Sequence, residues 1–245
     1  MNSSTVAPVK MSRYTLPQPK GPKAMTIAVG FHCKDGIVFA ADRQFTKAGA
    51  FKYHAKKFVT FNHGFVELAL VFAGKPGIFE EMQQKVFARL EQIDDLTTEL
   101  VRETIENVLV SMGWKERYLD GNLYLLVAVN ALFESSKMLV FDGASLRQAE
   151  SGVCVVGCGD TSLVRYLEDH LYSPEMPIRE GEALAAYLIK KATQYVDYCG
   201  EPIDVITSDA SGVHEVAASD IAASIQKMES QEPYLATLLV QTPFS

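Results

Sequence analysis

A threonine, an aspartate and two lysines stand near the start of the sequence in an order that suggests hydrolytic chemistry. Thr26 opens one apolar segment, Asp42 ends the next, and Lys56 and Lys57 open another. A threonine hydroxyl is a weak nucleophile that needs a base. The α-amino group of Thr26 would supply one, because α-amines have pKa values of about 7.7–8 and are partly neutral near pH 7. That role requires Thr26 to be the first residue of the mature chain, so removal of residues 1–25 decides whether an active site can form.

Each of these residues also has a purely structural explanation. Threonine at the start of a strand reflects ordinary β-propensity. Aspartate after a strand is usually a turn residue, and lysine is common on solvated strand edges. The hypothesis therefore depends on the ordered set and its spacing rather than on any single residue.

The elements that must position these residues can be predicted from the hydrophobic pattern. Short apolar runs predict strands over 26–33, 37–41, 57–61, 66–72, 122–131, 137–141, 153–156, 203–207 and 213–216. Apolar spacing of three to four residues predicts helices from about 78 to 93, 100 to 112, 160 to 172 and 180 to 198, and a short final helix opening at Ser219 or Asp220. Strands that pair with their neighbours and helices that come in pairs predict an α+β fold, with antiparallel sheets face to face and helices outside.

Composition limits the class of protein. The chain has 245 residues, of which 48% are hydrophobic, and it suits a single domain over 26–245 behind a flexible, proline-bearing leader over 1–25. A net charge of -7 without a basic stripe argues against nucleic-acid binding. No apolar run reaches the ~18 residues of a membrane span, and the leader lacks the apolar segment of a secretory signal. The four cysteines show no zinc-ligand spacing, so we expect reduced thiols, a cytoplasmic protein and no metal or organic cofactor.

Four segments of the sequence resemble the beta-type subunits of proteasomes. The first and most specific runs from Thr26 through Lys34–Asp42 and Thr46 to Lys56-Lys57. The other three are Phe72-Ala73-Gly74 before a helix, the block 156–160, and the block 200–205 after a long helix. The resemblance covers Thr26 to about Val216, and it implies the four-layer α-β-β-α sandwich of N-terminal nucleophile hydrolases.

The resemblance also assigns roles to individual residues. Thr26 matches the nucleophile, Asp42 the acid and Lys57 the lysine of the family site, with Lys56 as runner-up because the spacing after Thr46 is one residue short. Gly74 matches the glycine whose N–H forms the oxyanion hole. Thr46 matches the residue that binds the substrate backbone.

Other matches depart from the family pattern. Cys158 stands where serine is common, which replaces a good hydrogen-bond donor with a poor one. A second acid and serine map only loosely onto Asp197 and Cys199. Met25 replaces the glycine that usually precedes the threonine, an arrangement similar to the simpler bacterial relative whose initiator methionine is trimmed. Translation beginning at Met25 is one explanation of this pattern.

The family's pocket for the residue before the cleaved bond matches four apolar positions: Phe45, Ala55, Phe72 and Pro76. We therefore expect a preference for hydrophobic side chains. The resemblance further implies peptide or unfolded protein substrates, a ring homo-oligomer, and an ATPase or alpha-type ring as partner. Two alternatives remain open, an unprocessed inactive subunit of the same fold and an N-terminal-nucleophile amidase for small molecules.

Overall fold

The computed structural model describes residues 26–47, 51–115, 119, 122–132, 134–149, 152–157, 170–196 and 198–241. Four predicted features lie outside these ranges: the leader 1–25, Cys158, Asp197 and most of the helix predicted between 160 and 172.

Thr26 comes immediately before an inner strand of the first five-stranded sheet. Its order is β10 (Val153–Gly157), β1 (Ile27–Cys33), β2 (Gly36–Asp42), β11 (Ile203–Asp209) and β12 (Gly212–Glu215), and all neighbours are antiparallel. The strand β2 lies at the centre and pairs with β1 and with β11, where Ile203 stands opposite Asp42. The carboxylate at the end of β2 therefore lies beside the residues that lead into β11.

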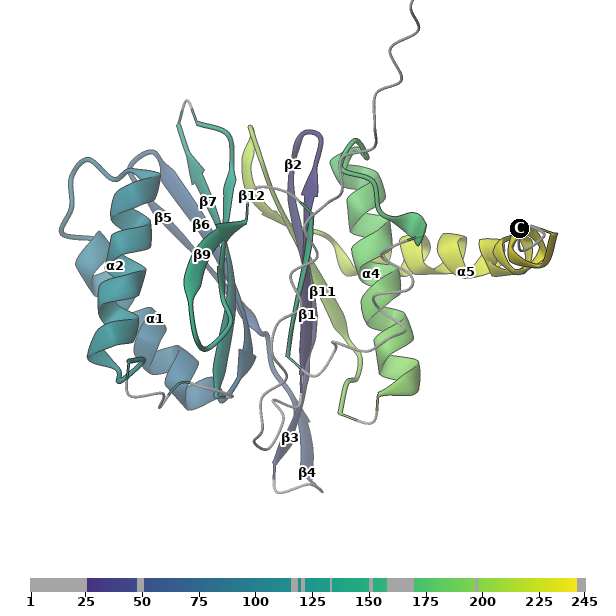
Figure 1. Cartoon of the computed structure of the whole chain (residues 1–245), viewed down its shortest axis with the longest axis horizontal. Coiled ribbons are helices and arrows are strands. Elements are labelled where there is room, and N and C mark those ends of the chain that lie inside the picture. Colours follow the sequence, from purple (N-terminus) through teal and green to yellow (C-terminus); the bar gives the residue numbers. More distant parts are fainter. Residues whose placement is uncertain are drawn as a thin grey trace, which may run out of the picture.

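The second sheet has the order β5 (Phe58–His63), β6 (Val66–Gly74), β7 (Leu123–Ala131), β8 (Lys137–Phe141) and β9 (Leu146–Ala149). It is also antiparallel throughout. Between the two sheets in sequence, β3 (Gln44–Lys47) and β4 (Phe51–His54) form a separate hairpin. This hairpin projects from one end of the molecule (Figure 1).

Helices cover the outer face of each sheet. The pair α1 (Pro76–Leu90) and α2 (Thr98–Ser111) lies on the second sheet, and α4 (Ile178–Tyr195) lies on the first, with α5 (Ala218–Gln241) packed against α4 (Figure 1). The architecture is therefore the predicted α+β, four-layer α-β-β-α sandwich. Among the described residues no helix is long and apolar enough to span a membrane.

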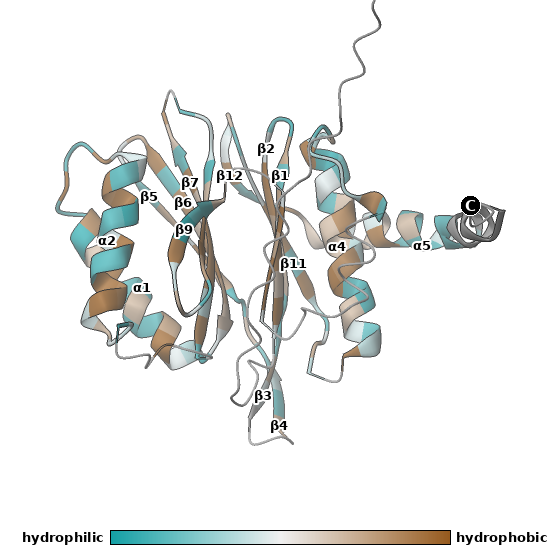
Figure 2. Ribbon diagram, viewed as in Figure 1, coloured by the Kyte–Doolittle hydropathy of each residue, from teal (hydrophilic) through white to brown (hydrophobic). Residues whose placement is uncertain are grey.

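Alternation along the strands explains why both faces of each sheet are covered. In β6, Leu68 and Leu70 pack toward the helices α1 and α2, whereas Ala69 and Val71 join the core between the sheets. Successive side chains of a strand point to opposite faces, so a strand that is apolar at every position needs a partner on each side. The apolar strands lie between the helical layers in Figure 2.

The structure confirms the predicted strands and the three helices predicted over 78–93, 100–112 and 180–198, with ends shifted by a few residues. It adds β3, β4 and β9, which the pattern did not predict. The expectation of a short final helix is wrong, because α5 runs for 24 residues with Pro233 inside it. A proline favours a helix end, but α5 continues through Pro233, and the turn before that proline is held on α4, where Lys191 binds Glu229 and Glu232.

Candidate active site

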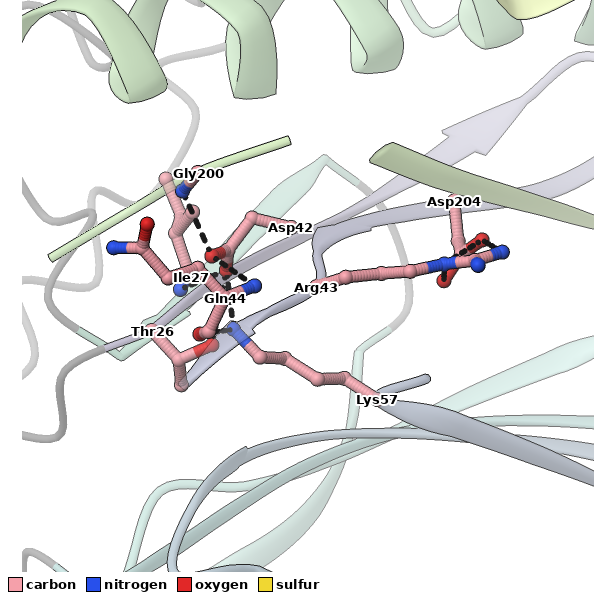
Figure 3. Close-up of polar contacts among 8 residues, drawn as sticks. All are labelled: Thr26, Ile27, Asp42, Arg43, Gln44, Lys57, Gly200 and Asp204. Atoms are coloured by element: carbon pink, nitrogen blue, oxygen red, sulfur yellow. Dashed lines mark hydrogen bonds and ion pairs between the residues drawn. The ribbon is translucent and has the colours of Figure 1, made fainter. Parts of the chain in front are cut away.

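Asp42 is the centre of the candidate site. Its carboxylate is fully buried, and one oxygen, Oδ1, accepts from Lys57 Nζ at 2.6 Å and from Thr26 Oγ1 at 3.0 Å. The backbone N–H of Ile27 donates to the same oxygen at 3.1 Å. The other oxygen, Oδ2, accepts from the N–H groups of Gln44 and Gly200, both at 3.1 Å (Figure 3). An ionised carboxylate only accepts hydrogen bonds, so this set of donors suits the charged form.

Lys57 is buried as completely as Asp42. Its Nζ donates to Asp42 Oδ1 and to the carbonyl of Gln44, each at 2.6 Å, and lies 4.7 Å from the centre of the Phe45 ring. The neighbouring Lys56 is instead about half exposed and binds Glu215 at 2.8 Å. The lysine that meets Asp42 is therefore Lys57, the first of the two sequence candidates.

Burial makes this ion pair costly to break. Two charges removed from water lose their hydration, and their mutual attraction compensates only when the geometry is close and the remaining donors are satisfied. The Lys57 ammonium meets two oxygens within hydrogen-bond distance, and the Asp42 carboxylate meets five donors from the described residues. This arrangement fixes the direction in which each group points.

Thr26 lies immediately before β1, and only 1% of its surface is exposed. Gly157 of β10 packs against its carbonyl so closely that a Cβ there would lie 2.1 Å from the oxygen and 3.0 Å from Ala73 Cβ. Gly157 also has a φ of 89°, which L side chains rarely adopt. Glycine is thus the residue that lets the start of β1 approach the end of β6.

Gly74 follows Ala73 at that end of β6, which places it next to the Thr26 segment. Its φ is 133°, and a Cβ on it would lie 2.2 Å from the carbonyl oxygen of Asn122. The following N–H, from Lys75, donates to that same carbonyl at 2.8 Å. The turn into α1 therefore requires glycine at this position.

The predicted substrate-binding residues lie beside Lys57 on β3 and β6. The Oγ1 atom of Thr46 is buried and has no hydrogen-bond partner, which is rare for a buried polar atom in a folded protein. Phe45 and Phe72 are 5% and 3% exposed, with ring centres 5.9 Å apart, and Phe72 stacks on Phe79 at 3.9 Å. They belong to the core under α1 and α2.

Sequence reasoning missed four participants: Arg43, Gln44, Gly200 and Asp204. The backbone of Gln44 binds both Asp42 and Lys57, and its side chain lies so near Gly200 that a Cβ there would lie 2.3 Å from Gln44 Oε1. The glycine at 200 was the available signal, since it permits this close approach. Arg43 forms a bidentate ion pair with Asp204, and no local sequence pattern predicts a contact between residues so far apart in the chain.

The described residues contain no group of three or more His, Cys, Asp or Glu side chains that could hold a metal ion. The functional groups that meet at the site are the Thr26 hydroxyl, the Asp42 carboxylate and the Lys57 ammonium. A hydroxyl and an ammonium that share one carboxylate oxygen form the kind of arrangement in which nucleophilic catalysis operates.

The antiparallel four-layer α-β-β-α sandwich is the fold of the N-terminal nucleophile hydrolases. Within that class the chain belongs to the proteasome subunit family, whose pattern it matches over residues 23–207.

Two relatives have similar sequences along most of their length. A proteasome subunit beta from Methanobrevibacter ruminantium is 24% identical over 212 residues, covering 84% of this chain and 96% of the relative. A proteasome subunit beta from Archaeoglobus profundus is 22% identical over 202 residues, covering 80% and 90% respectively.

Solved structures of Anbu proteins share the fold. Anbu (ancestral beta-subunit) from Yersinia bercovieri superposes with a TM-score of 0.69 at 15% identity, covering 90% of this chain and 99% of that one. A Gly-1 mutant of Anbu from Hyphomicrobium sp. strain MC1 gives 0.74 at 14% identity, with the same coverage. The helical assembly of the Anbu complex from Pseudomonas aeruginosa gives 0.67 at 17%, covering 90% and 98%.

Proposed function

We propose that this chain is a threonine endopeptidase in which Thr26 becomes an N-terminal nucleophile once residues 1–25 are lost. The observation that carries the proposal is that the Thr26 hydroxyl donates to the Asp42 oxygen that also binds the buried Lys57 ammonium. Proteasome family membership supports it independently.

The proposed reaction begins when the free amine of Thr26 takes the proton of its own hydroxyl. Lys57 acts as a fixed cation that stabilises the developing alkoxide, since its ammonium is already held by Asp42 and the Gln44 carbonyl. The Thr26 oxygen attacks the carbonyl carbon of a peptide bond. The oxyanion receives a hydrogen bond from the N–H of Gly74, and the amine returns its proton to the leaving nitrogen.

An acyl-enzyme on Thr26 Oγ results, and water hydrolyses it after activation by the same amine. Before processing, the nitrogen of Thr26 is an amide, which is no base at neutral pH. The 1% exposure of Thr26 also means that a substrate reaches it only after whatever covers it has moved. The unprocessed chain is therefore inert in this proposal.

The wider proposal is a cytoplasmic, chambered assembly. The copies form a ring homo-oligomer that admits peptides or unfolded protein, with an ATPase or alpha-type ring as partner. Electron microscopy of the native protein tests this. A closed ring supports the proposal, an open helix would match the form named for the Pseudomonas aeruginosa Anbu complex, and single copies would favour a small-molecule amidase.

The decisive experiment combines intact mass with peptide hydrolysis. Protein purified from its native host should have the mass of a chain that begins at Thr26, and Thr26→Ala should lose peptide hydrolysis by at least about 10³-fold. Thr60→Ala is the matched control, because Thr60 is an exposed threonine on β5. An assembled protein that retains Met1, or an active Thr26→Ala variant, would overturn the proposal in favour of an inactive subunit or a different nucleophile.

Substrate preference is the finer part of the proposal. The apolar side chains next to Lys57, chiefly Phe45 and Phe72, favour a hydrophobic residue before the cleaved bond. Fluorogenic peptides ending in Tyr or Leu should be hydrolysed faster than those ending in Arg or Glu. The opposite order would contradict this preference while leaving the nucleophile untouched.

A further inference from the structure

We infer that Arg43 and Asp204 form a positioning pair, which holds the backbone between Asp42 and Gln44 so that both residues can bind Lys57. This inference rests on the proposed function and adds two residues to it that neither touch the substrate nor react.

The pair itself is a two-pronged contact with a buried carboxylate. Asp204 on β11 is 4% exposed, and Arg43 Nε lies 2.9 and 2.8 Å from its two oxygens, while Nη2 also contacts Oδ1 (Figure 3). Hydrogen bonding to Asp204 raises the pKa of Arg43, against the opposing effect of burial. A planar guanidinium that meets a carboxylate in this way fixes both direction and distance.

The backbone of Arg43 is held from two further directions. Its N–H donates to the carbonyl of Pro202 at 2.9 Å, and its carbonyl accepts from the N–H of Ala55 at 3.0 Å. Pro202 stands just before β11, and Ala55 stands two residues before Lys57. Arg43 therefore joins three segments that are far apart in the sequence and all meet at the site.

Arg43 stands between the two residues that bind Lys57. The residue before Arg43 is Asp42 and the residue after it is Gln44, and each provides one oxygen at 2.6 Å from Lys57 Nζ. The N–H of Gln44 also closes back onto Asp42 Oδ2. A rotation of the backbone at Arg43 would displace both of these oxygens from the ammonium.

The loop before β11 is tied to the same carboxylate. The N–H of Gly200 donates to Asp42 Oδ2, and Asp204 follows four residues later. Releasing Arg43 would therefore loosen Asp42 from the β2 side and from the β11 side together. Positional errors of about 1 Å at a catalytic group can cost on the order of 100-fold in rate.

A purely structural ion pair would stabilise the fold without affecting turnover, so kinetics must separate the two roles. The test compares Arg43→Gln and Arg43→Lys with Arg102→Gln, whose arginine forms a partly exposed ion pair with Glu99 on α2. Each variant is purified as the processed assembly, and kcat and KM are measured on one fluorogenic peptide below the unfolding temperature.

We expect Arg43→Gln to lower kcat by on the order of 10- to 100-fold with KM within about twofold. Arg43→Lys should restore little, because an ammonium is a point charge that cannot bind both oxygens of Asp204 in one plane. Arg102→Gln should behave as wild type. A wild-type kcat in Arg43→Gln, or full rescue by lysine, would overturn the inference.

Two additions keep the test decisive. If Arg43→Gln does not fold, Arg43→Met combined with Asp204→Leu removes both charges without leaving either buried alone. A wild-type kcat in that double variant would overturn the inference, and a reduced kcat supports it.

If the wild-type assembly hydrolyses no peptide, the proposed function fails and hydrogen exchange still tests the pair. The Gly200 and Gln44 amides should exchange faster in Arg43→Gln than in Arg102→Gln. Unchanged exchange would show that Arg43 does not hold them.

Discussion

Among the described residues, Lys57 and Lys191 are the two buried lysines, and their surroundings differ. Lys57 stands just before β5, and its fully buried side chain binds Asp42 and the Gln44 carbonyl. Lys191 on α4 has a side chain that is 11% exposed, and it binds Glu232 at 2.6 Å and Glu229 at 3.8 Å on α5. Both ammonium groups are matched by carboxylates, so burial and charge pairing do not distinguish them.

The difference lies in what holds the partners. Glu229 and Glu232 project from one helix and are 37% and 39% exposed, so water can replace the lysine if it leaves. Asp42 is fixed by backbone N–H groups from three segments, and its oxygen also receives a hydroxyl, that of Thr26. A buried lysine becomes a candidate for catalysis when its partners are rigid and a nucleophile shares them. The Lys191 cluster instead joins two helices.

Replacing Lys57 by methionine should produce the largest effect. Removing one partner of a buried pair leaves Asp42 as an uncompensated charge, which costs about 3–5 kcal/mol of unfolding free energy. Peptide hydrolysis should fall by at least about 10³-fold, since the cation beside the proposed nucleophile is lost. Urea unfolding and steady-state kinetics measure the two effects separately.

A second substitution sharpens this result. Lys57→Met with Asp42→Asn removes both charges and should recover part of the stability but none of the activity. Recovery of activity in the double variant would mean that the pair stabilises the fold and takes no part in the reaction.

Gly157→Ala should give the next largest effect, because it acts on the same region through the backbone. The new Cβ would meet the Thr26 carbonyl oxygen at 2.1 Å in a residue with positive φ. We expect a loss of about 1–3 kcal/mol of unfolding free energy and at least about 10-fold in kcat. Gly64→Ala is the control, since Gly64 also has positive φ but its Cβ would meet nothing within 4 Å. If both variants lost the same activity, the loss in Gly157→Ala would be due to backbone strain alone and not to the contact with Thr26.

Replacing Lys191 by methionine should be far milder. The partly exposed glutamates can be hydrated once the lysine is gone, so the expected loss is about 1 kcal/mol of unfolding free energy. The kcat for peptide hydrolysis should stay within about twofold of wild type. A loss of activity comparable to that of Lys57→Met would break the contrast between the two lysines.

The pH dependence of the Lys191 cluster should give the smallest effect. Hydrogen bonding to Lys191 lowers the pKa of Glu232 from its usual value of 4.5, with burial opposing. Because the folded-state pKa is depressed, this contribution to stability is complete above pH 4.5 and is lost as the pH falls through the folded value. Glu232→Gln should remove that acid-side loss, worth under about 1 kcal/mol, in urea midpoints compared at neutral and acid pH. An unchanged profile would mean that Glu232 does not titrate differently in the folded state.

Much of the fold could be predicted because the strands and helices carry their pattern locally. The apolar run of β7 and the three- to four-residue spacing of α1 predict their elements within a few residues. The hydrophobic pattern did not predict the hairpin of β3 and β4, because its strands have four residues each and β4 is largely exposed. Stacking of Phe45 on Tyr53 helps to stabilise this hairpin, and that contact forms only once β3 has paired with β4. The length of α5 was not predicted because Pro233 is a local signal for a helix end, whereas the helix continues through it.

The site was predictable where a single residue type is required and not where distant segments meet. Thr26, Asp42 and Lys57 could be picked out from order and resemblance, and the structure brings them together. The choice between Lys56 and Lys57 depended on orientation, since adjacent extended residues point to opposite sides. The bonds of Gly200 to Asp42 and of Arg43 to Asp204 span 158 and 161 residues of sequence. They follow from the pairing of β2 with β11, which local pattern does not reveal.

The place of β1 within its sheet bears on what a cut before Thr26 would do to the molecule. Strand β1 has β10 on one side and β2 on the other, and the first N–H after Thr26 is bound to Asp42. New chain ends usually fray because little holds them. Here the residue after the new terminus, Ile27, would already belong to β1, an inner strand of the first sheet. A cut before Thr26 would therefore leave a new terminus that β2, β10 and Asp42 already hold in place.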